Sequence, residues 1–490
     1  MNAHVTIATI IRAARDTGFS LKGHGLQTAI AASAAASCAS DGDEVEPNHV
    51  ADLSFTGEGG DLYNGAVFAK LYRDKLLFVH ETGEVLRFDE RSGWLSAAPG
   101  TAERAGKAVV GVLKDAASDK AQITHVARLC DVNDQRAMIE MAKSEPGMTV
   151  RLSDFDNDPM LLGVTNGVLD LKTGTLTPVS PEVLISKRSN VAYDPGATCP
   201  RFDKFMREVQ PDPHVRAFLQ RWMGYCLTGR TDARKFAFLY GHGANGKSVF
   251  VELMAWLLDD YARKIQTEML MHHQRNPQAP SPDIVSLKGM RLVYANETEE
   301  GRHFDAARLK DLTGGVDTLT GRVPYGKANI TFSPTHKLVI VGNHKPEVSD
   351  TSDGMWDRVL LIPFGQTFPD GKRDPHLLHK LKGEGSGILN WMLAGLRDYL
   401  AHGLQVPPTI KTATDAYRDE QDIIGEWIRD NCNTGAGYSV AKRELYISYT
   451  TWAAQNGHKP LAQGRLTRRL ADRRFPLSPD RRKVQGLTPK

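Results

Sequence analysis

The residues best suited to chemistry lie in a glycine-rich loop that reads GHGANGKS, at positions 241–248. Gly241, Gly246, Lys247 and Ser248 match the pattern GxxxxGK followed by Ser or Thr, without a gap. Glycines let backbone N–H groups curl around phosphate oxygens, and a helix that begins at the loop adds the positive end of its dipole. At this spacing a lysine reaches the β- and γ-phosphates of a nucleotide, and a hydroxyl ligates Mg²⁺.

The surroundings of this loop support a nucleoside triphosphate site over the alternative, a chance glycine turn before a helix. An apolar strand is expected at 235–240 and an apolar helix from 247 to 258, which is the context that the pattern requires. Lys247 is expected to face solvent as a phosphate ligand. The residues predicted to bind the nucleotide are Gly241, Gly243, Asn245, Gly246, Lys247 and Ser248.

Hydrolysis of a triphosphate also needs an acid and a polar sensor beyond neighbouring strands. The stretch LVYANETEEG places Glu297 at a strand end, with Glu299 and Glu300 close behind. One acid is expected to hold Mg²⁺ and one to polarise the attacking water; which of Glu297 and Glu299 does which stays open. The alternative for Glu299 and Glu300 is a solvated acidic loop. In KLVIVGN, Asn343 ends the next strand and is expected to orient the water.

The order of apolar segments predicts an α/β domain with a parallel sheet, because strands alternate with helical stretches. Further strands are expected at 291–297, 337–343 and 359–364, and helices at 201–229 and 385–404. Upstream, short strands and helical periodicity alternate from 62 to 182 and indicate a mixed α+β domain. Residues 1–58 are rich in Ala and Ser and are expected to be flexible, with a short helix at 5–17; the alternative for 26–40 is a lipoprotein signal.

Composition narrows the class of protein. The formal net charge is +3 over 490 residues, so any basic binding surface must be local. The chain has 5 cysteines and none forms a CxxC pair, which offers no zinc-ribbon spacing and favours reduced thiols in a cytoplasm. No apolar run reaches the roughly 18–20 residues that a membrane helix needs. We therefore expect a cytoplasmic protein without a membrane partner.

Together these motifs resemble a superfamily 3 helicase of the phage and plasmid primase-helicase group. The resemblance rests on GHGANGKS, ANETEEG, LKDLTGGVDTLTGRVPYGK, FSPTHKLVIVGNHKP and MWDRVLLIPF, and covers roughly residues 60–490. Upstream, DFDNDPMLLGVTNGVLDLKTG resembles the domain that precedes the helicase in that group. It implies an AAA+-like core, ATP and Mg²⁺ as cofactors, and a homo-oligomeric, hexameric ring that moves 3′→5′ on single-stranded DNA, in a bacterial cytoplasm if the gene belongs to a phage.

The resemblance also implies roles for single residues. Lys247 is the phosphate lysine, Asn343 the sensor, and Arg358 an arginine finger that would reach the γ-phosphate of a neighbouring subunit. The alternative for Arg358 is an ion pair with a nearby acid such as Asp357. One departure stands out: Asn296 occupies the first of two adjacent acid positions, which leaves Glu297 as the catalytic acid and Glu299 as the substitute for the second carboxylate.

Two regions are candidates for DNA binding. The run GGVDTLTGRVPYGKANITF is expected to form a hairpin that carries Arg322, Tyr325 and Lys327, and the resemblance implies that it projects into the ring channel; the alternative is a charged surface hairpin. The basic tail resembles a winged helix with 463–474 as its recognition helix, although it could also be a solvated face. Its candidate contacts are Arg465, Arg468, Arg469, Arg473 and Arg474.

These observations favour an ATP-driven replicative DNA helicase that acts on single-stranded and forked DNA, with a primase or polymerase as a further partner. Two alternatives remain: a bifunctional helicase-primase, and a DNA-binding initiator that uses ATP only to assemble. The first 200 residues show no DxD-like pair in a strand context, and DFDND at 154–158 is the nearest match. The expected domains are a flexible segment 1–58, an accessory domain 59–200, an ATPase core 201–375 with leading helices 201–230, a helical region 376–434 and a winged-helix-like domain 435–490.

Overall fold

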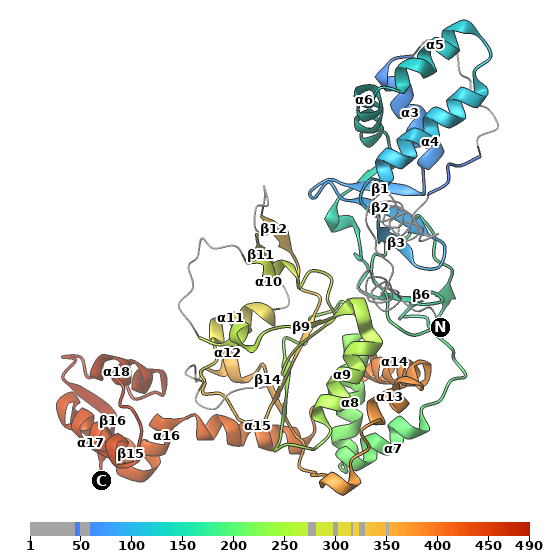
Figure 1. Cartoon of the computed structure of the whole chain (residues 1–490). Helices are drawn as coiled ribbons and strands as arrows, with labels where there is room; N and C mark the ends of the chain where they lie inside the picture. The colour runs from blue at the N-terminus through green and yellow to red at the C-terminus, as the bar shows by residue number, and fades with distance from the viewer. Residues whose placement is uncertain are drawn as a thin grey trace, which may run out of the picture. The chain divides into compact units, whose positions relative to one another are not determined.

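The structure is a computed structural model that describes residues 45–49, 59–272, 281–296, 302–314, 317–322, 329–348, 350 and 352–490 (Figure 1). Its contacts divide these residues into two compact units. The first takes the described residues up to 152, apart from 90–93; the second takes 90–93 and the described residues from 153 onwards. The expected flexible segment and helix at the N-terminus lie outside the described residues, apart from 45–49.

The first unit packs helices beside a small sheet. Its strands follow the order β3-β2-β1-β4, in which β1 pairs antiparallel with β2 and parallel with β4. Asp119 and Gln122 form a reciprocal capping box at the start of α5, which is a sequence-encoded helix start. The elements are α3 (Asp61–Tyr72), β1 (Leu76–Val79), β2 (Val85–Asp89), β3 (Gly93–Ser96), α4 (Thr101–Ala116), α5 (Lys120–Leu129), α6 (Val132–Lys143) and β4 (Thr149–Val150).

The second unit is built on a five-stranded sheet of order β14-β8-β13-β10-β9. All four neighbouring pairs are parallel, so the predicted α/β domain with a parallel sheet is confirmed. The strands are β8 (Phe236–Tyr240), β9 (Ala262–Lys264), β10 (Leu292–Asn296), β13 (Lys337–Gly342) and β14 (Val359–Pro363). The edge strand β9 was not expected from the sequence.

Both faces of this sheet are covered, which explains why its strands are almost continuously apolar. In β8, Ala237 and Leu239 join one hydrophobic core and Phe236 and Phe238 join the other, as the two-residue repeat of a strand requires. The first core is shared with α7 (Pro200–Val209), α8 (Pro213–Cys226), α9 (Lys247–Leu258), α13 (Leu377–Lys382) and α14 (Gly385–His402). The second is shared with α10 (Pro282–Val285), α11 (Ala306–Leu312), α12 (Asp353–Trp356) and α15 (Pro408–Glu420).

Smaller sheets flank this core. β5 (Leu161–Val164), β6 (Gly167–Asp170) and β7 (Leu176–Thr177) form an antiparallel sheet upstream of α7. β11 (Leu319–Gly321) and β12 (Ile330–Phe332) pair antiparallel and form the base of the predicted hairpin, whose residues 323–328 lie outside the described residues. Within the part of the chain that the structure describes, no helix is both long and apolar enough to cross a membrane.

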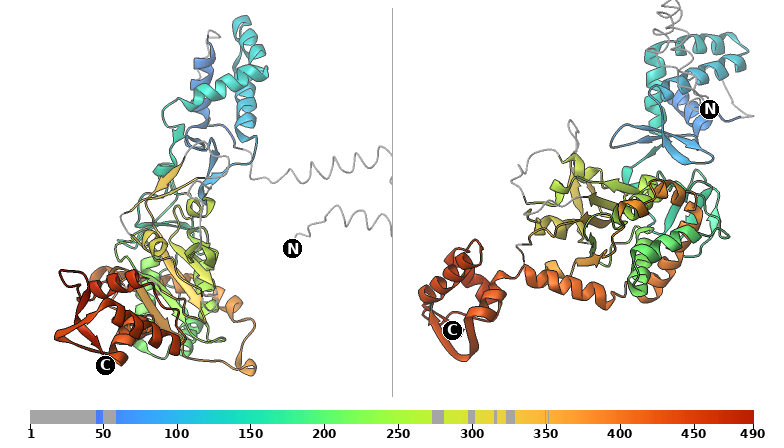
Figure 2. Two further views of the ribbon diagram at one scale, coloured as in Figure 1. Left: turned by 90° about the vertical axis from the view of Figure 1, so that its left-hand side faces the viewer. Right: turned by 60° about the horizontal axis from the view of Figure 1, so that its bottom comes forward.

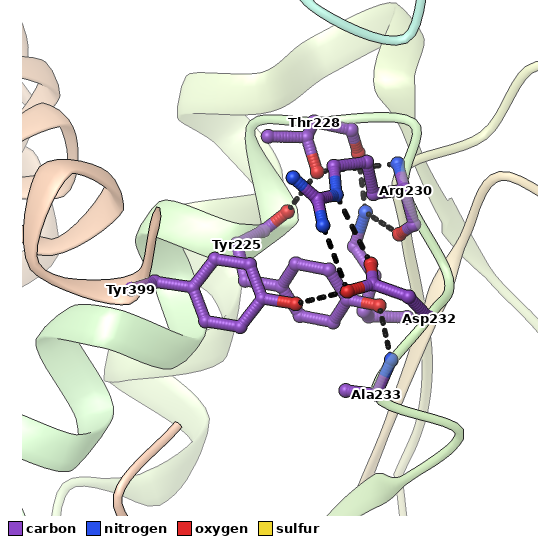
Figure 3. Close-up of polar contacts among 7 residues, drawn as sticks. Tyr225, Thr228, Arg230, Asp232, Ala233 and Tyr399 are labelled. Carbon is purple, nitrogen blue, oxygen red and sulfur yellow. Dashed lines mark hydrogen bonds and ion pairs between the residues drawn. The ribbon is translucent and has the colours of Figure 1, made fainter. Parts of the chain in front are cut away.

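The connection from α8 into β8 is tied to α14 by polar contacts (Figure 3). Arg230 and Asp232 form an ion pair at 2.9 Å between Nη2 and Oδ2. The Tyr399 hydroxyl of α14 donates to Asp232 Oδ2 at 3.0 Å, and the Ala233 N–H donates to the Tyr225 hydroxyl at 3.2 Å. The strand that leads to the glycine-rich loop therefore starts from a fixed turn.

The chain leaves the sheet through α15 and enters a C-terminal subdomain with a core of its own (Figure 2). This subdomain consists of α16 (Ile423–Asn431), β15 (Cys432–Ala441), α17 (Lys442–Gln455), α18 (Gln463–Asp472) and β16 (Lys483–Pro489). β15 pairs antiparallel with β16. Leu477, upstream of β16, forms an isolated antiparallel bridge with Val484 of β16. Ile424 and Trp427 belong to this core, although they precede residue 435, where the domain was expected to begin.

Helices α8 and α14 approach so closely that only glycine fits at their contact, and this predicts a strong effect of Gly224→Ala. A Cβ on Gly224 would lie 2.2 Å from the Leu396 backbone nitrogen. Overpacking of this kind typically costs about 1–3 kcal/mol, and backbone atoms cannot move aside as a side chain can. We expect a lower unfolding midpoint in denaturant. Gly354→Ala is the control, because its added Cβ meets nothing within 4 Å. An equal midpoint for both variants would contradict the close contact.

Candidate active site

The glycine-rich loop between β8 and α9 needs small residues because other backbone lies against it. A Cβ on Gly241 would lie 2.3 Å from the Phe364 carbonyl oxygen. Gly246 has a φ of 84°, in the left-handed region that favours glycine, and a Cβ there would lie 2.5 Å from Val209 Cγ1. Ala244 also lies in that region, with a φ of 60°. An alanine there costs of order 1 kcal/mol, and such strain clusters at functional sites.

Lys247 is buried at the start of α9. Its side chain is 3% exposed, so the expectation that it faces solvent is wrong. Its Nζ donates to the Gly241 carbonyl at 2.5 Å, to Asn245 Oδ1 at 3.0 Å and to Asn343 Oδ1 at 3.2 Å. Burial lowers the pKa of Lys247 to about 8. The structure thus joins four predicted site residues, although 96 positions separate Lys247 from Asn343.

Asn245 fixes the loop to the end of β14. Its Nδ2 donates to the His242 carbonyl at 2.6 Å and to the Phe364 carbonyl at 3.1 Å. The Phe368 N–H donates to the Ala244 carbonyl at 2.9 Å, so the chain after β14 runs along the loop. These contacts were not expected, because nothing in the sequence shows that 364–368 lies against 241–245. Gly243 and Ser248 are exposed on the same loop and helix start.

The segment predicted to carry the catalytic acids follows β10, and the structure describes it only up to Asn296. Glu297 and Glu299 lie outside the described residues. Asn296 ends β10, where it pairs in register with Val341 of β13. Its Oδ1 is buried and accepts no hydrogen bond from the described residues. A buried acceptor without a donor is costly and is uncommon unless water, an ion or a ligand occupies the site.

Arg358 lies at the opposite end of the sheet from Lys247. Its carbonyl accepts from the Phe236 N–H at 2.8 Å, beside the first residue of β8, whereas the glycine-rich loop follows the last residue of β8. Five extended residues span about 16 Å, more than an arginine side chain covers. Its Nε is buried without a hydrogen-bond partner, and within the described residues no ion pair joins it to Asp357.

The residues predicted to bind DNA lie far from the glycine-rich loop in the sequence, after β11 and in the C-terminal subdomain. Arg322 is exposed where β11 ends, and its backbone exchanges hydrogen bonds with Ser281. Tyr325 and Lys327 lie outside the described residues. In the C-terminal subdomain Arg465, Arg468 and Arg474 are exposed, and Arg469 is partly buried.

Arg473 differs from the other arginines of this set, because its guanidinium pairs with Asp422, the residue that caps α16. It is therefore committed to a contact inside the subdomain. Arg481 and Arg482 are exposed on the turn before β16; their place in a basic run after a proline was the available signal, but they were not among the candidates.

Comparison with known proteins gives one family match and several viral relatives. Residues 65–211 match the family described as D5 N terminal like. A provisionally named helicase of Acanthamoeba polyphaga mimivirus is 29% identical over 330 residues, which cover 62% of this chain and 34% of that protein. A provisionally named helicase of Invertebrate iridescent virus 3 is 25% identical, over 61% of this chain and 35% of that protein.

A provisionally named primase of African swine fever virus is 26% identical, over 62% of this chain and 34% of that protein. The matched part is thus about a third of the length of each of these viral relatives. Among solved structures, the apo C-terminal region of NrS-1 aligns with 88% of this chain at a TM-score of 0.49 and 12% identity, too low a similarity to carry an argument. The family match and the viral relatives confirm the resemblance recognised from the motifs: this chain is similar to viral proteins named as helicases and primases, and its residues 65–211 match the D5 N-terminal-like model.

Proposed function

We propose that this chain is an ATP-dependent DNA helicase with an AAA+-like core. It hydrolyses ATP between copies of itself, as a hexameric ring, and moves 3′→5′ along single-stranded DNA. The observation that carries the proposal is the contact of Lys247 with Asn343, which joins a phosphate-binding loop to a polar strand end. The names of the viral relatives support the same activity.

The topology of the sheet supports a ligand site at this contact. From β8 the chain goes through α9 to the edge strand β9, and from β13 it crosses through α12 to β14 on the other side of β8. The helices α9 and α12 belong to opposite hydrophobic cores. β8 and β13 are therefore neighbouring strands whose connections lie on opposite faces of the sheet. In open α/β sheets such a pair leaves a crevice at the carboxyl ends of its strands, and ligands bind there.

Charge explains how this crevice would bind a triphosphate. Lys247 is a buried cation at the N-terminus of α9, and its partners within the described part of the chain are all neutral oxygens. The helix dipole is positive at this end, so it destabilises the ammonium and stabilises an anion. Phosphate oxygens would replace the Gly241 carbonyl as acceptors for Lys247. Asn343 would then orient the attacking water beside the γ-phosphate.

The oxygen atoms near this loop fit Mg²⁺, which prefers hard oxygen ligands. The Ser248 hydroxyl is exposed at the helix start, and Asn296 Oδ1 has no partner within the described residues. When bound, Mg²⁺ would offset the charge of the triphosphate. Glu297 and Glu299 stay predicted as the acid that polarises water and as a metal ligand, in an order that is open.

Arg358 would complete the site from a neighbouring copy. Its own chain places it at the amino end of β8, which excludes it from the nucleotide bound by its own Lys247. In a neighbour's site its charge would stabilise the transferring phosphoryl group. The hairpin around Arg322 and the C-terminal arginines would bind the DNA backbone, because lysine and arginine neutralise phosphates.

A bifunctional helicase-primase remains the second candidate, because the African swine fever virus relative bears the name of a primase. Incorporation of labelled nucleotides on an unprimed template separates the two functions. An assay of fork unwinding separates both from an initiator that uses ATP only to assemble.

Nucleotide affinity should depend on pH through Lys247. Its pKa of about 8 in the free protein means that it is charged at neutral pH and loses its proton above that value. The phosphates bind the charged form, so affinity should be constant below about pH 7.5 and fall up to tenfold per pH unit above about pH 8. The measurement is equilibrium binding of a non-hydrolysable ATP analogue. Lys247→Arg should lose this dependence, since arginine stays charged, and Lys247→Ala should bind weakly throughout. A flat profile for the parent protein would refute the assignment.

Catalysis across an interface predicts that two inactive variants restore each other. Arg358→Ala should bind ATP normally and hydrolyse it poorly, with a loss of about 10³-fold or more. Mixed with Lys247→Ala, it should recover part of the rate, because some interfaces then pair an intact loop with an intact arginine. ATP turnover of the mixture against each variant alone is the readout. Full activity of Arg358→Ala alone would rule out the finger.

The arginines of the C-terminal subdomain should divide into two classes. Arg465→Ala and Arg468→Ala should weaken DNA binding and reduce the log–log salt slope by about one unit each. Arg473→Ala should instead lower the stability of the subdomain, because it removes the ion pair with Asp422. DNA titrations over a salt series, paired with thermal unfolding, measure both effects. If Arg465→Ala and Arg468→Ala leave the slope unchanged, α18 is not a DNA-binding helix.

A further inference from the structure

The last turn of α15 holds the loop that follows the proposed sensor. The carboxylate of Glu420 accepts from Lys345 Nζ with both oxygens, at 2.8 and 2.7 Å. The buried Tyr417 hydroxyl donates to the Pro346 carbonyl, and the Val348 N–H donates to Gln421 Oε1 at 2.9 Å. All of these contacts fall on residues 345–348, directly after Asn343.

Lys345 also contacts the strand that carries the glycine-rich loop. Its Nζ lies 5.1 Å from the ring centroid of Tyr240, the last residue of β8, and 5.6 Å from that of Tyr417. A cation over two aromatic faces and beside a carboxylate is held from three directions. This lysine therefore lies where the phosphate-binding strand, the sensor loop and α15 meet.

The same turn of α15 contacts the segment that precedes the proposed finger. Arg418 forms an ion pair with Asp353, at the start of α12. The Tyr417 ring packs edge-on against Trp356, with centroids 5.1 Å apart. Both partners lie within five residues of Arg358 in the chain. One helix end thus supports the sensor of its own site and the arginine proposed for the neighbouring site.

Beyond Glu420 a short, hydrogen-bonded connection leads into the C-terminal subdomain. Gln421 and Asp422 donate backbone hydrogen bonds back to Tyr417 and Asp419, at 3.2 and 3.1 Å. Asp422 caps α16 and pairs with Arg473, which follows the last residue of α18. Glu420 pairs with Lys345 of the sensor loop, and Asp422 pairs with Arg473 at the end of α18. Only Gln421 separates these two acids in the chain.

We propose that Glu420 and Tyr417 are positioning residues that couple DNA binding by the C-terminal subdomain to ATP turnover. This inference rests on the proposed function. DNA bound to α18 would shift the position of the end of α15 through the contact of Asp422. The contacts of Glu420 and Tyr417 would then shift the loop that follows Asn343. Because Asn343 lies 3.2 Å from Lys247 Nζ, a small shift of its loop changes how the site meets the γ-phosphate.

A purely structural role makes a different prediction. The side chains of Lys345 and Glu420 are 19% and 52% exposed, and an ion pair whose carboxylate reaches solvent contributes on the order of 1 kcal/mol to folding. Loss of this pair should therefore leave the fold intact, so that a change in the response to DNA reports coupling.

The test compares Glu420→Gln with a matched control in ATPase assays with and without single-stranded DNA. Asp374→Asn is the control, because it also removes one carboxylate from an exposed ion pair, with Lys380 at 2.6 Å, in the same unit. We expect Glu420→Gln to lower the DNA-stimulated kcat about tenfold while the basal kcat, the KM for ATP, DNA affinity and the unfolding midpoint stay unchanged. Asp374→Asn should behave like the parent protein.

Two further variants test the route. Tyr417→Phe keeps the ring against Trp356 but removes the hydrogen bond to Pro346, and should also reduce stimulation. Lys345→Met combined with Glu420→Gln should be no worse than either single variant, since one interaction is being removed twice. Parent-like stimulation in Glu420→Gln overturns the inference, as does an equal loss of basal and stimulated rates. A parent protein without ATPase activity overturns the proposed function itself, and the coupling with it.

Discussion

The hydrogen bond between Lys247 and Asn343 is the contact on which the rest of the site depends. Lys247 is 3% exposed, so its ammonium group carries a desolvation cost, and its partners among the described residues are neutral oxygens. Such a site is stable because two neighbouring strands, β8 and β13, end at the same edge of the sheet. The hydrophobic cores on both faces of the sheet fix β8 and β13, and these two strands hold Lys247 beside Asn343.

A second buried lysine in the same sheet shows why the position of Lys247 matters. Lys337 begins β13 and donates to the carbonyls of Thr228 and Arg230, just past the C-terminus of α8, where the helix dipole is negative. Its Nζ also lies 4.7 Å from the Tyr225 ring centroid. That dipole stabilises the cation of Lys337, whereas the dipole of α9 opposes that of Lys247. Lys337 thus has a helix C-terminus and backbone carbonyls as partners, although burial still lowers its pKa to about 7. On the proposed function, Lys247 would instead be stabilised by a bound anion.

The sequence predicted the central strands well because strands buried on both faces are continuous apolar runs. It could not predict β9, which has three residues, two of them charged. The spacing of GHGANGKS located the loop, but the burial of Lys247 depends on Asn245 and on the chain after β14, which is more than a hundred positions away. For the same reason Arg473 read as a DNA contact, although Asp422 engages it. Local patterns predict local structure, and contacts between distant segments decide which side chains are free to act.

The division of the proposed site along the strands also constrains assembly. Each chain places the loop of Lys247 at the carboxyl end of β8 and Arg358 beside its amino end, with β14 directly between Arg358 and the residues that hold the loop. A site made from both ends needs a second copy: a two-fold contact would complete two such sites reciprocally, whereas a head-to-tail contact would complete one site at each interface. Head-to-tail contacts close into rings when the rotation allows. On the proposed function, the ring is the head-to-tail solution, and the guanidinium of Arg358 would find its phosphate partner at the interface with the next copy, because its own chain keeps it beside the amino end of β8.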